Sequence, residues 1–178
     1  LILFVLITAQ SLSASVLKVE PGPSKINNVT INLLAKLKSL EGHEIKLFPV
    51  GAALGRATLL RVPVFVAQMY VSDPFLYVLP TFNPIGTINN PNLKAAALQM
   101  TVLHKISAKN IKSLFQRGFK ANDLNNDDIR QALTKIEGAG GIQTDDGTHA
   151  ITIVGEKLID GTEVVRYENS ATGIVQTI

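Results

Sequence analysis

The chain has no cysteine and no tryptophan, and only 17% of its 178 residues are charged. The absence of cysteine excludes disulfide bonds and thiolate chemistry. The low charge and the 46% of hydrophobic residues are typical of a globular protein and exclude a disordered or fibrous one. A chain of this length buries roughly 70% of its unfolded surface and needs no cross-links. The composition therefore predicts one globular domain.

Long runs of one charge are missing as well. The 17 Lys and Arg residues are scattered among 14 Asp and Glu residues, which gives a net charge of +3. Nucleic-acid-binding domains gather their positive charge into a patch or along one helix. We therefore predict no nucleic-acid partner, and we assign the small positive charge to solubility.

The N-terminus resembles a targeting segment. The apolar run "LILFVLITA" is too short to span a bilayer, and small polar residues follow it. Ser13-Ala14-Ser15 offers small residues at the positions that a signal peptidase reads, which predicts a signal peptide over residues 1–15 with cleavage after Ser15. The alternative is a buried N-terminal strand. Cleavage predicts an exported protein, periplasmic or extracellular, with no membrane span after the signal is removed.

The remaining chain divides into a linker and a domain. Two prolines, a glycine and two asparagines in "KVEPGPSKINN" predict a linker over residues 16–28. The domain then covers residues 29–178, and we expect it to be incomplete at the C-terminus because "GIVQTI" stops within a strand pattern. The pattern of "VTINLLAKLKSL" fits a helix and a strand equally, so its type stays open.

The apolar patterns predict strands, then two helices, then strands. "HEIKLFPVG" reads as a strand that Pro49 and Gly51 end, and the nearly all-apolar "VPVFVAQMYV" as a central strand covered on both faces. "LKAAALQMTVLHKI" alternates, Ser107 opens one helix, and a second helix begins after Asn126 or Asp127. Three β-rich segments follow, with turn signals at 160–161 and 172–173. This order predicts an α+β fold whose antiparallel sheet is covered by helices on one face.

Catalytic signatures are few. The three histidines, His43, His104 and His149, lie far apart, and there is no serine elbow or phosphate loop, so we predict no metal and no cofactor. Arg56 follows the glycine-rich "GAALG". At the rim of an apolar cleft its rigid fork of donors would select a carboxylate or enolate oxygen. The alternative is an exposed loop charge.

Four segments together resemble the chalcone isomerase-like proteins, especially their bacterial, exported members. These are a G-x-x-x-G-R turn, "VFVAQMYV", "LQMTVLHKIS" and "SAKNIKSLFQRGF", in that order, and the likeness covers about residues 44–122. The resemblance implies an open-faced β-sandwich, in which a long antiparallel sheet lies under a helical layer with a ligand cleft between them. It also implies a final helix beyond the end of this chain.

The resemblance implies a site that has lost its polar groups. In plant chalcone isomerase the arginine of the glycine turn positions the substrate and stabilises oxyanion charge, and a Thr, a Tyr and an Asn complete the network. Arg56 corresponds to that arginine, whereas Phe65, Ile111 and Gly118 stand at the other three positions. Losing even one oxyanion donor costs about 10²–10³ in rate. The resemblance therefore implies little catalysis, and Arg56 is the one catalytic candidate if the protein is an enzyme.

These features predict a non-catalytic cell-envelope protein that binds a small amphipathic carboxylate, such as a fatty acid, in an apolar cleft. The predicted ligand-binding residues are Arg56, Phe65, Tyr70, Ile111, Phe115 and Gly118. Two alternatives stay open. One is an intramolecular lyase of the chalcone isomerase type that uses Arg56 with Tyr70 or His104. The other is a structural or partner-binding envelope protein whose cleft is filled by its own side chains.

Overall fold

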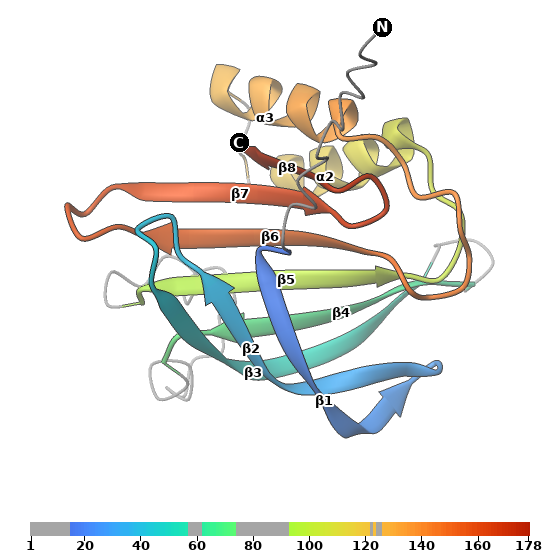
Figure 1. The fold of residues 1–178 in the computed structure, drawn as a ribbon. Coiled ribbons are helices and arrows are strands. Elements are labelled where there is room, and N and C mark those ends of the chain that lie inside the picture. The colour runs from blue at the N-terminus through green and yellow to red at the C-terminus, as the bar shows by residue number, and fades with distance from the viewer. Residues whose placement is uncertain (1–14, 57–61, 74–92, 122, 124–125) are drawn as a thin grey trace, which may run out of the picture.

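Eight strands form a single antiparallel sheet, in which the order along the chain is also the order in the sheet (Figure 1). A computed structural model describes residues 15–56, 62–73, 93–121, 123 and 126–178. The strands are β1 Leu17–Ile26, β2 Val29–Lys38, β3 Glu44–Arg56, β4 Pro63–Val71, β5 Ala95–Val102, β6 Ala150–Lys157, β7 Glu163–Asn169 and β8 Ile174–Thr177. The helices α2 Ala108–Ala121 and α3 Asp127–Gly138 lie between β5 and β6.

The first hairpin occupies the segment that the sequence predicted to be a linker. Asn27 and Asn28 both have positive φ, 48° and 67°, and make the two-residue turn that suits the twist of a hairpin. Pro21 lies on an edge strand at a register shift, where proline removes no needed ladder hydrogen bond. Residues 17–26 are therefore a strand. Residues 29–38, for which the sequence left helix and strand open, also form a strand.

The third strand belongs to two parts of the sheet. Its residues 44–47 pair with β2, and its residues 48–56 pair with β4. Pro49 and Gly51, which were predicted to end the strand, instead flank a register shift within it. Such bulges bend a strand and raise its twist. As a result β1 and β2 fold back across one face of β4–β6 (Figure 1).

Each face of the central strands packs against a different layer. On one face, Leu37 of β2 and Leu47 of β3 share a buried cluster with Tyr70 of β4. On the other face, Ile111 of α2 and Ile136 of α3 pack against Met100 of β5. The strand predicted to be central and covered on both sides is confirmed, because β4 lies between β3 and β5 and contributes to both clusters.

Both helices begin where the sequence indicated. The Asn110 amide donates to Ser107 Oγ (3.2 Å), and the Ile129 amide donates to Asn126 Oδ1 (2.9 Å), so each helix has its expected N-terminal cap. The α3 helix stops at the "GAGG" segment, where Gly140 has a φ of +84°. In the part of the chain that the structure describes, no helix combines the length and the apolar character needed to cross a bilayer.

The prediction of an α+β open-faced sandwich under a helical layer is wrong. The structure is mostly β, one eight-stranded antiparallel sheet with two helices of 14 and 12 residues among the described residues. The difference arises at the N-terminus, where two ten-residue strands replace a linker and an undecided element. These strands also occupy the face that an open-faced sandwich would leave uncovered. The expected signal peptide lies outside the described residues except for Ser15.

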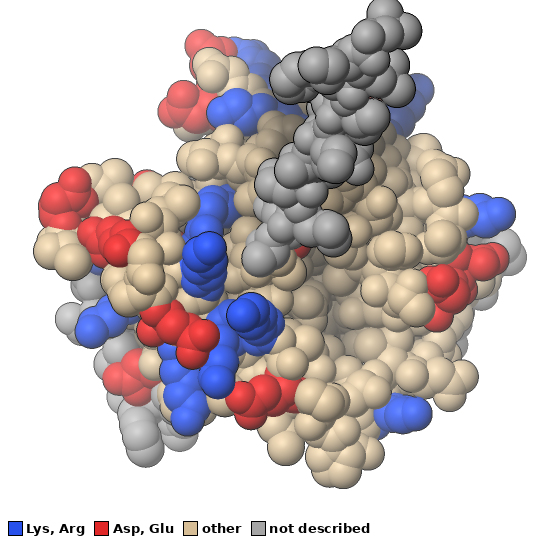
Figure 2. Space-filling model, in the orientation of Figure 1, with Lys and Arg blue, Asp and Glu red and all other residues tan. Residues whose placement is uncertain are grey.

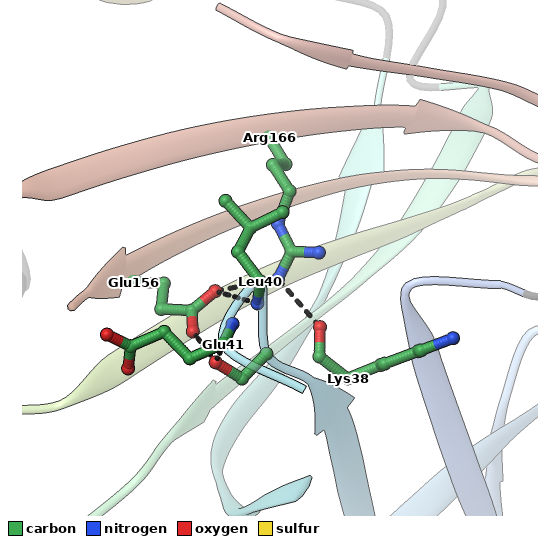
Figure 3. A network of polar contacts seen from close by, with 6 residues as sticks. Lys38, Leu40, Glu41, Glu156 and Arg166 are labelled. Atoms are coloured by element: carbon green, nitrogen blue, oxygen red, sulfur yellow. Dashed lines mark hydrogen bonds and ion pairs between the residues drawn. The ribbon is translucent and has the colours of Figure 1, made fainter. Parts of the chain in front are cut away.

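A buried polar network holds the folded-back strands against the sheet (Figure 3). Arg166 of β7 forms an ion pair with Glu156 of β6 at 2.8 Å, and its guanidinium also donates to the Lys38 carbonyl of β2 at 2.9 Å. Ser39 Oγ donates to the other Glu156 oxygen, and the Leu40 amide donates to Glu156 at 3.3 Å. The end of β2 is thereby fixed above β6 and β7.

The outer face of the folded-back strands is solvated. Lys18, Lys36 and Lys46 lie side by side in register across β1, β2 and β3. Glu20 and Glu44 form ion pairs with the middle lysine at 3.4 and 3.9 Å. In Figure 2 basic and acidic side chains accordingly alternate over this part of the surface. The interspersed charge offsets the repulsion that adjacent lysines would otherwise cause.

We expect the two buried tyrosines to respond oppositely to loss of the hydroxyl. Tyr70 accepts from Asn32 Nδ2 (3.0 Å) and donates to Gln68 (3.1 Å), whereas the Tyr167 hydroxyl has no hydrogen-bond partner among the described residues. Burial raises the pKa of both phenols, and the hydrogen bond from Asn32 partly offsets this at Tyr70.

Tyr70→Phe should therefore lower the free energy of unfolding by about 1–3 kcal/mol, while Tyr167→Phe should leave it unchanged or raise it by about 1 kcal/mol. Urea unfolding of both variants at neutral pH measures the difference. Equal losses in the two variants would contradict the hydrogen-bond assignment.

Candidate functional site

A cleft of about 590 Å³ opens where β3 and β5 end and α2 begins. We call it the basic cleft. Its walls come from the end of β3, from Val62 and the start of β4, from the segment between β5 and α2, and from α2 itself. The residues that line it are Arg56, Val62, Val64, Phe65, His104, Lys105, Ile106, Asn110, Ser113, Leu114 and Arg117.

A register shift lies between Gly55 and Arg56, at the end of β3. Gly55 pairs with Phe65, but Arg56 pairs with Pro63, so Val64 is the extra residue of a bulge. Arg56, Val64 and Phe65 all line the cleft next to this bulge. Bulges are the usual means of re-aiming a side chain next to a site.

Gly55 is required by the close approach of the Phe65 ring. A Cβ atom at position 55 would lie only 2.3 Å from ring carbons of Phe65. The ring therefore lies directly over the glycine backbone and forms part of the apolar wall of the cleft. The glycine and arginine of the "GR" pair thus have separate roles, one making space and the other supplying charge.

Backbone hydrogen bonds hold the segment between β5 and α2 in place. The Leu103 amide donates to the Val64 carbonyl at 2.8 Å, which fixes the start of this segment on β4. Ile106 and Ile142 exchange two backbone hydrogen bonds of 2.8 and 2.9 Å, which fix its end next to α3. His104 and Lys105 lie between these two anchors and face the basic cleft from a constrained loop.

One stripe of α2 forms the remaining wall. Asn110, Ser113, Leu114 and Arg117 are spaced at i, i+3, i+4 and i+7, and such residues share one side of a helix. The neighbouring stripe carries Ile111, which is fully buried in the core. The cleft therefore borders the flank of the helix rather than its buried side.

The charged side chains that line the cleft are all positive. Arg56, Lys105 and Arg117 carry positive charge, and none of the described residues that line the cleft is acidic. Within the described ranges, no carboxylate forms an ion pair with any of the three. All three are exposed, so they keep their hydration and cost little to place there. The cleft can therefore attract an anion without first breaking internal ion pairs.

The structure brings together two of the six residues that the sequence analysis selected. Arg56 and Phe65 line the basic cleft. Tyr70 lies on the opposite face of β4, where it is fully buried.

The other three selected residues lie on α2 but outside the lining. Ile111 is fully buried in the core, and Phe115 packs edge-on against Tyr167 with ring centroids 6.2 Å apart. Gly118 is exposed, and a Cβ atom added there would meet nothing within 4 Å.

Sequence reasoning missed the cations that α2 and the preceding loop contribute. Neither Lys105 nor Arg117 was among the residues selected from the sequence. The available signal was the polar flank of the helix, in which Asn110, Ser113 and Arg117 repeat at three and four residues. His104 was named from the sequence as a helper of Arg56 in a lyase, and His104 does line the same cleft.

Two other concavities in the described structure are smaller. One of about 390 Å³ shares His104 with the basic cleft and includes Asp145 and Asp146. The Thr148 side chain and amide donate to Asp146, and these hydrogen bonds lower the pKa of that carboxyl. In the described ranges no three His, Asp or Glu side chains gather closely enough to hold a metal ion.

We expect Gly55→Ala to disturb the cleft wall. The new methyl group would collide with the Phe65 ring, and overpacking of this kind lowers the free energy of unfolding by about 1–3 kcal/mol. Gly51→Ala is a matched control on the same strand, because nothing lies within 4 Å of its added Cβ. In a double-mutant cycle, Phe65→Leu should recover part of the loss at Gly55. Urea unfolding of the four variants tests this, and additive losses would contradict the proposed contact.

Neither a family model nor a curated protein matches the chain. The resemblance to chalcone isomerase-like proteins therefore stays a prediction that rests on the sequence segments alone. The eight-stranded sheet also differs from the sandwich that this resemblance implied. The chemistry of the basic cleft is accordingly derived from its own residues.

Proposed function

We propose that the protein binds a small amphipathic carboxylate, of the size and character of a fatty acid, in the basic cleft. The observation that carries the proposal is the composition of the lining, in which cations and apolar side chains occur together without a carboxylate. Such a lining complements a ligand with one anionic end and one apolar end. The proposal concerns binding and requires no chemical step.

The anionic end would be held at Arg56. A guanidinium presents parallel donors that match the two oxygens of a carboxylate. Arg117 and Lys105 add positive potential, and Asn110 and Ser113 offer further hydrogen-bond donors. Because these groups come from β3, the loop before α2 and α2 itself, their convergence depends on the folded structure.

The apolar end would contact the inner wall. Phe65, Ile106 and Leu114 are half-buried, so each presents part of an apolar surface to the cleft. The volume of about 590 Å³ lies within the 300–1,000 Å³ that is typical of small-molecule sites. An open cleft of this size supports ligand binding over the alternative in which the protein's own side chains fill the site.

The same lining favours a carrier over a lyase. Chalcone cyclisation needs donors placed around a developing oxyanion, and each absent donor costs about 10²–10³ in rate. The Tyr70 hydroxyl, which a lyase would use, lies on the other face of β4 and is occupied by Asn32 and Gln68. Of the predicted helpers of Arg56, only His104 lines the cleft.

Calorimetry with dodecanoate and dodecanol tests the proposal. Arg56→Ala and Arg117→Ala should each weaken dodecanoate binding about 10–100-fold, because one charge-assisted hydrogen bond contributes about 1.5–3 kcal/mol. Dodecanol, which has the same chain without the charge, should bind more weakly and respond little to either substitution. Raising the salt concentration should weaken dodecanoate binding only, since screening acts on the charge.

Gly118→Ala is the matched control. It follows Arg117 on the same helix, lies outside the cleft lining and has open space for a methyl group. It should leave dodecanoate binding unchanged while raising the free energy of unfolding by about 0.5–1 kcal/mol, because alanine favours the helix. Equal affinity for dodecanoate and dodecanol, or binding that survives loss of both arginines, would sink the proposal.

A further inference from the structure

Glu168 of β7 is a buried carboxylate that faces the start of the described chain. Its side chain belongs to a residue only 6% exposed. One oxygen, Oε2, accepts hydrogen bonds from the Val16 backbone amide and from Ser15 Oγ, both at 3.1 Å. Val16 is itself only 5% exposed, so the Val16 nitrogen and the carboxylate meet away from bulk water.

The groups around Glu168 leave its charge without a cation in the described part of the chain. Arg166 lies on the same face of β7, but its guanidinium is committed to Glu156 at 2.8 Å and to the Lys38 carbonyl at 2.9 Å. On β8 the residue opposite Glu168 is Val175. No described lysine, arginine or histidine forms an ion pair with Glu168.

A buried carboxylate without a cationic partner lowers the stability of the fold. A buried carboxylate is usually paired with a cation because hydrogen bonds from neutral groups replace only part of its lost hydration. One of the two donors is the nitrogen of Val16, which is a neutral amide while residue 15 precedes it. If Val16 were the first residue, the same nitrogen would be a positively charged ammonium group.

We propose that the chain is cut between Ser15 and Val16 and that Glu168 binds the α-ammonium group produced by the cut. Two independent lines meet at this bond. The small residues at Ser13 and Ser15 predict signal-peptide cleavage after position 15. The structure separately places the nitrogen of the next residue against a buried carboxylate. The inference does not depend on the ligand of the basic cleft.

The covalent step is hydrolysis of one peptide bond by a signal peptidase. The bond between the Ser15 carbonyl carbon and the Val16 nitrogen breaks, and water supplies a hydroxyl to the carbonyl carbon and a hydrogen to the nitrogen. The acid formed at Ser15 loses a proton and the amine of Val16 gains one. The products are a carboxylate and an ammonium group, with no oxidation or reduction.

The new charge needs no rearrangement to reach its partner. The Val16 nitrogen already lies 3.1 Å from Glu168 Oε2, within the range of an N–H···O hydrogen bond. Cleavage removes the Ser15 hydroxyl donor from the same oxygen and replaces a neutral amide with a cation. Because Val16 is buried in the fold, the cut must precede folding, and the processed chain gains the ion pair as it folds.

The first test measures the reactivity of the terminal amine. The chain that begins at Val16 is compared with one that begins at Ser13, each with Glu168 or with Glu168→Gln. Acylation of the α-amine at pH 7.5 is followed by mass spectrometry of the N-terminal peptide. The amine of Val16 should react at least about tenfold more slowly than that of Ser13, because the carboxylate of Glu168 favours the protonated amine and raises its pKa above the ordinary value near 8. Glu168→Gln should abolish most of the difference.

The second test measures stability against pH. The α-ammonium pKa should be higher in the folded than in the unfolded state, so its contribution is fully present below about pH 7.7 and is lost as pH rises through the folded value. The melting temperature of the chain from Val16 should therefore exceed that of the chain from Ser13 at pH 6, and the gap should close at alkaline pH. If Glu168→Gln fails to fold, Nα-acetylation of Val16 supplies the neutral reference.

Three results would overturn the proposal. The first is an exported protein whose mass places the N-terminus at a residue other than Val16. The second is an amine of Val16 that reacts as fast as that of Ser13. The third is a melting-temperature gap that does not change with pH. Glu156→Gln is a useful comparison, because it removes a buried charge nearby without touching the Val16 nitrogen.

Discussion

The bend of β3 between Pro49 and Gly51 decides what this sheet buries. Without it, the first three strands would extend an ordinary open sheet and leave one face wet. Because β3 turns, β2 lies over that face, and charged groups on β6 and β7 lose their water. The Glu156 and Arg166 side chains are only 1% and 8% exposed. A buried pair of this kind adds little net stability, but breaking it leaves a buried charge without a partner. The pair therefore disfavours any packing in which β2 is misplaced.

The basic cleft follows from the opposite side of the same arrangement. Where β3 ends, next to the bulge at Val64, Arg56 lines the cleft that α2 borders. The loop after β5 is tied to β4 at one end and to Ile142 at the other, so α2 starts at a fixed distance from this edge. Charges collect there because element ends are exposed, whereas the middle of the helix and sheet is committed to the core. The site is therefore peripheral to a rigid frame, which suits reversible binding.

Local signals in the sequence predicted local structure well. Ser107 and Asn126 cap helices, and the turns at Gly161 and Gly173 have positive φ as their residues indicated. Proline and glycine were misread where tertiary structure uses them differently: Pro21 is tolerated on an edge strand, and Pro49 marks a bulge. No periodicity in the sequence reveals that a strand will bend, and the prolines and glycine of residues 16–28 indicated a linker, so the mostly-β architecture could not be derived from it.

Within the candidate site, the alternation of side chains along β4 already indicated that two of the predicted ligand-binding residues could not face the same cleft. Phe65 and Tyr70 are five positions apart in one strand, an odd spacing that places them on opposite faces. On α2 the apolar repeat correctly located the core but said nothing about which flank would border a cleft. Which flank borders the cleft depends on where β3 ends, and this is set by contacts between residues that are distant in sequence. Arg56 and Glu168 also show that the sequence alone does not reveal the surroundings of a charged residue. An exposed cation costs little free energy at any position, so the residues around it determine its role. A buried anion costs free energy, so the donors beside it show how it is stabilised.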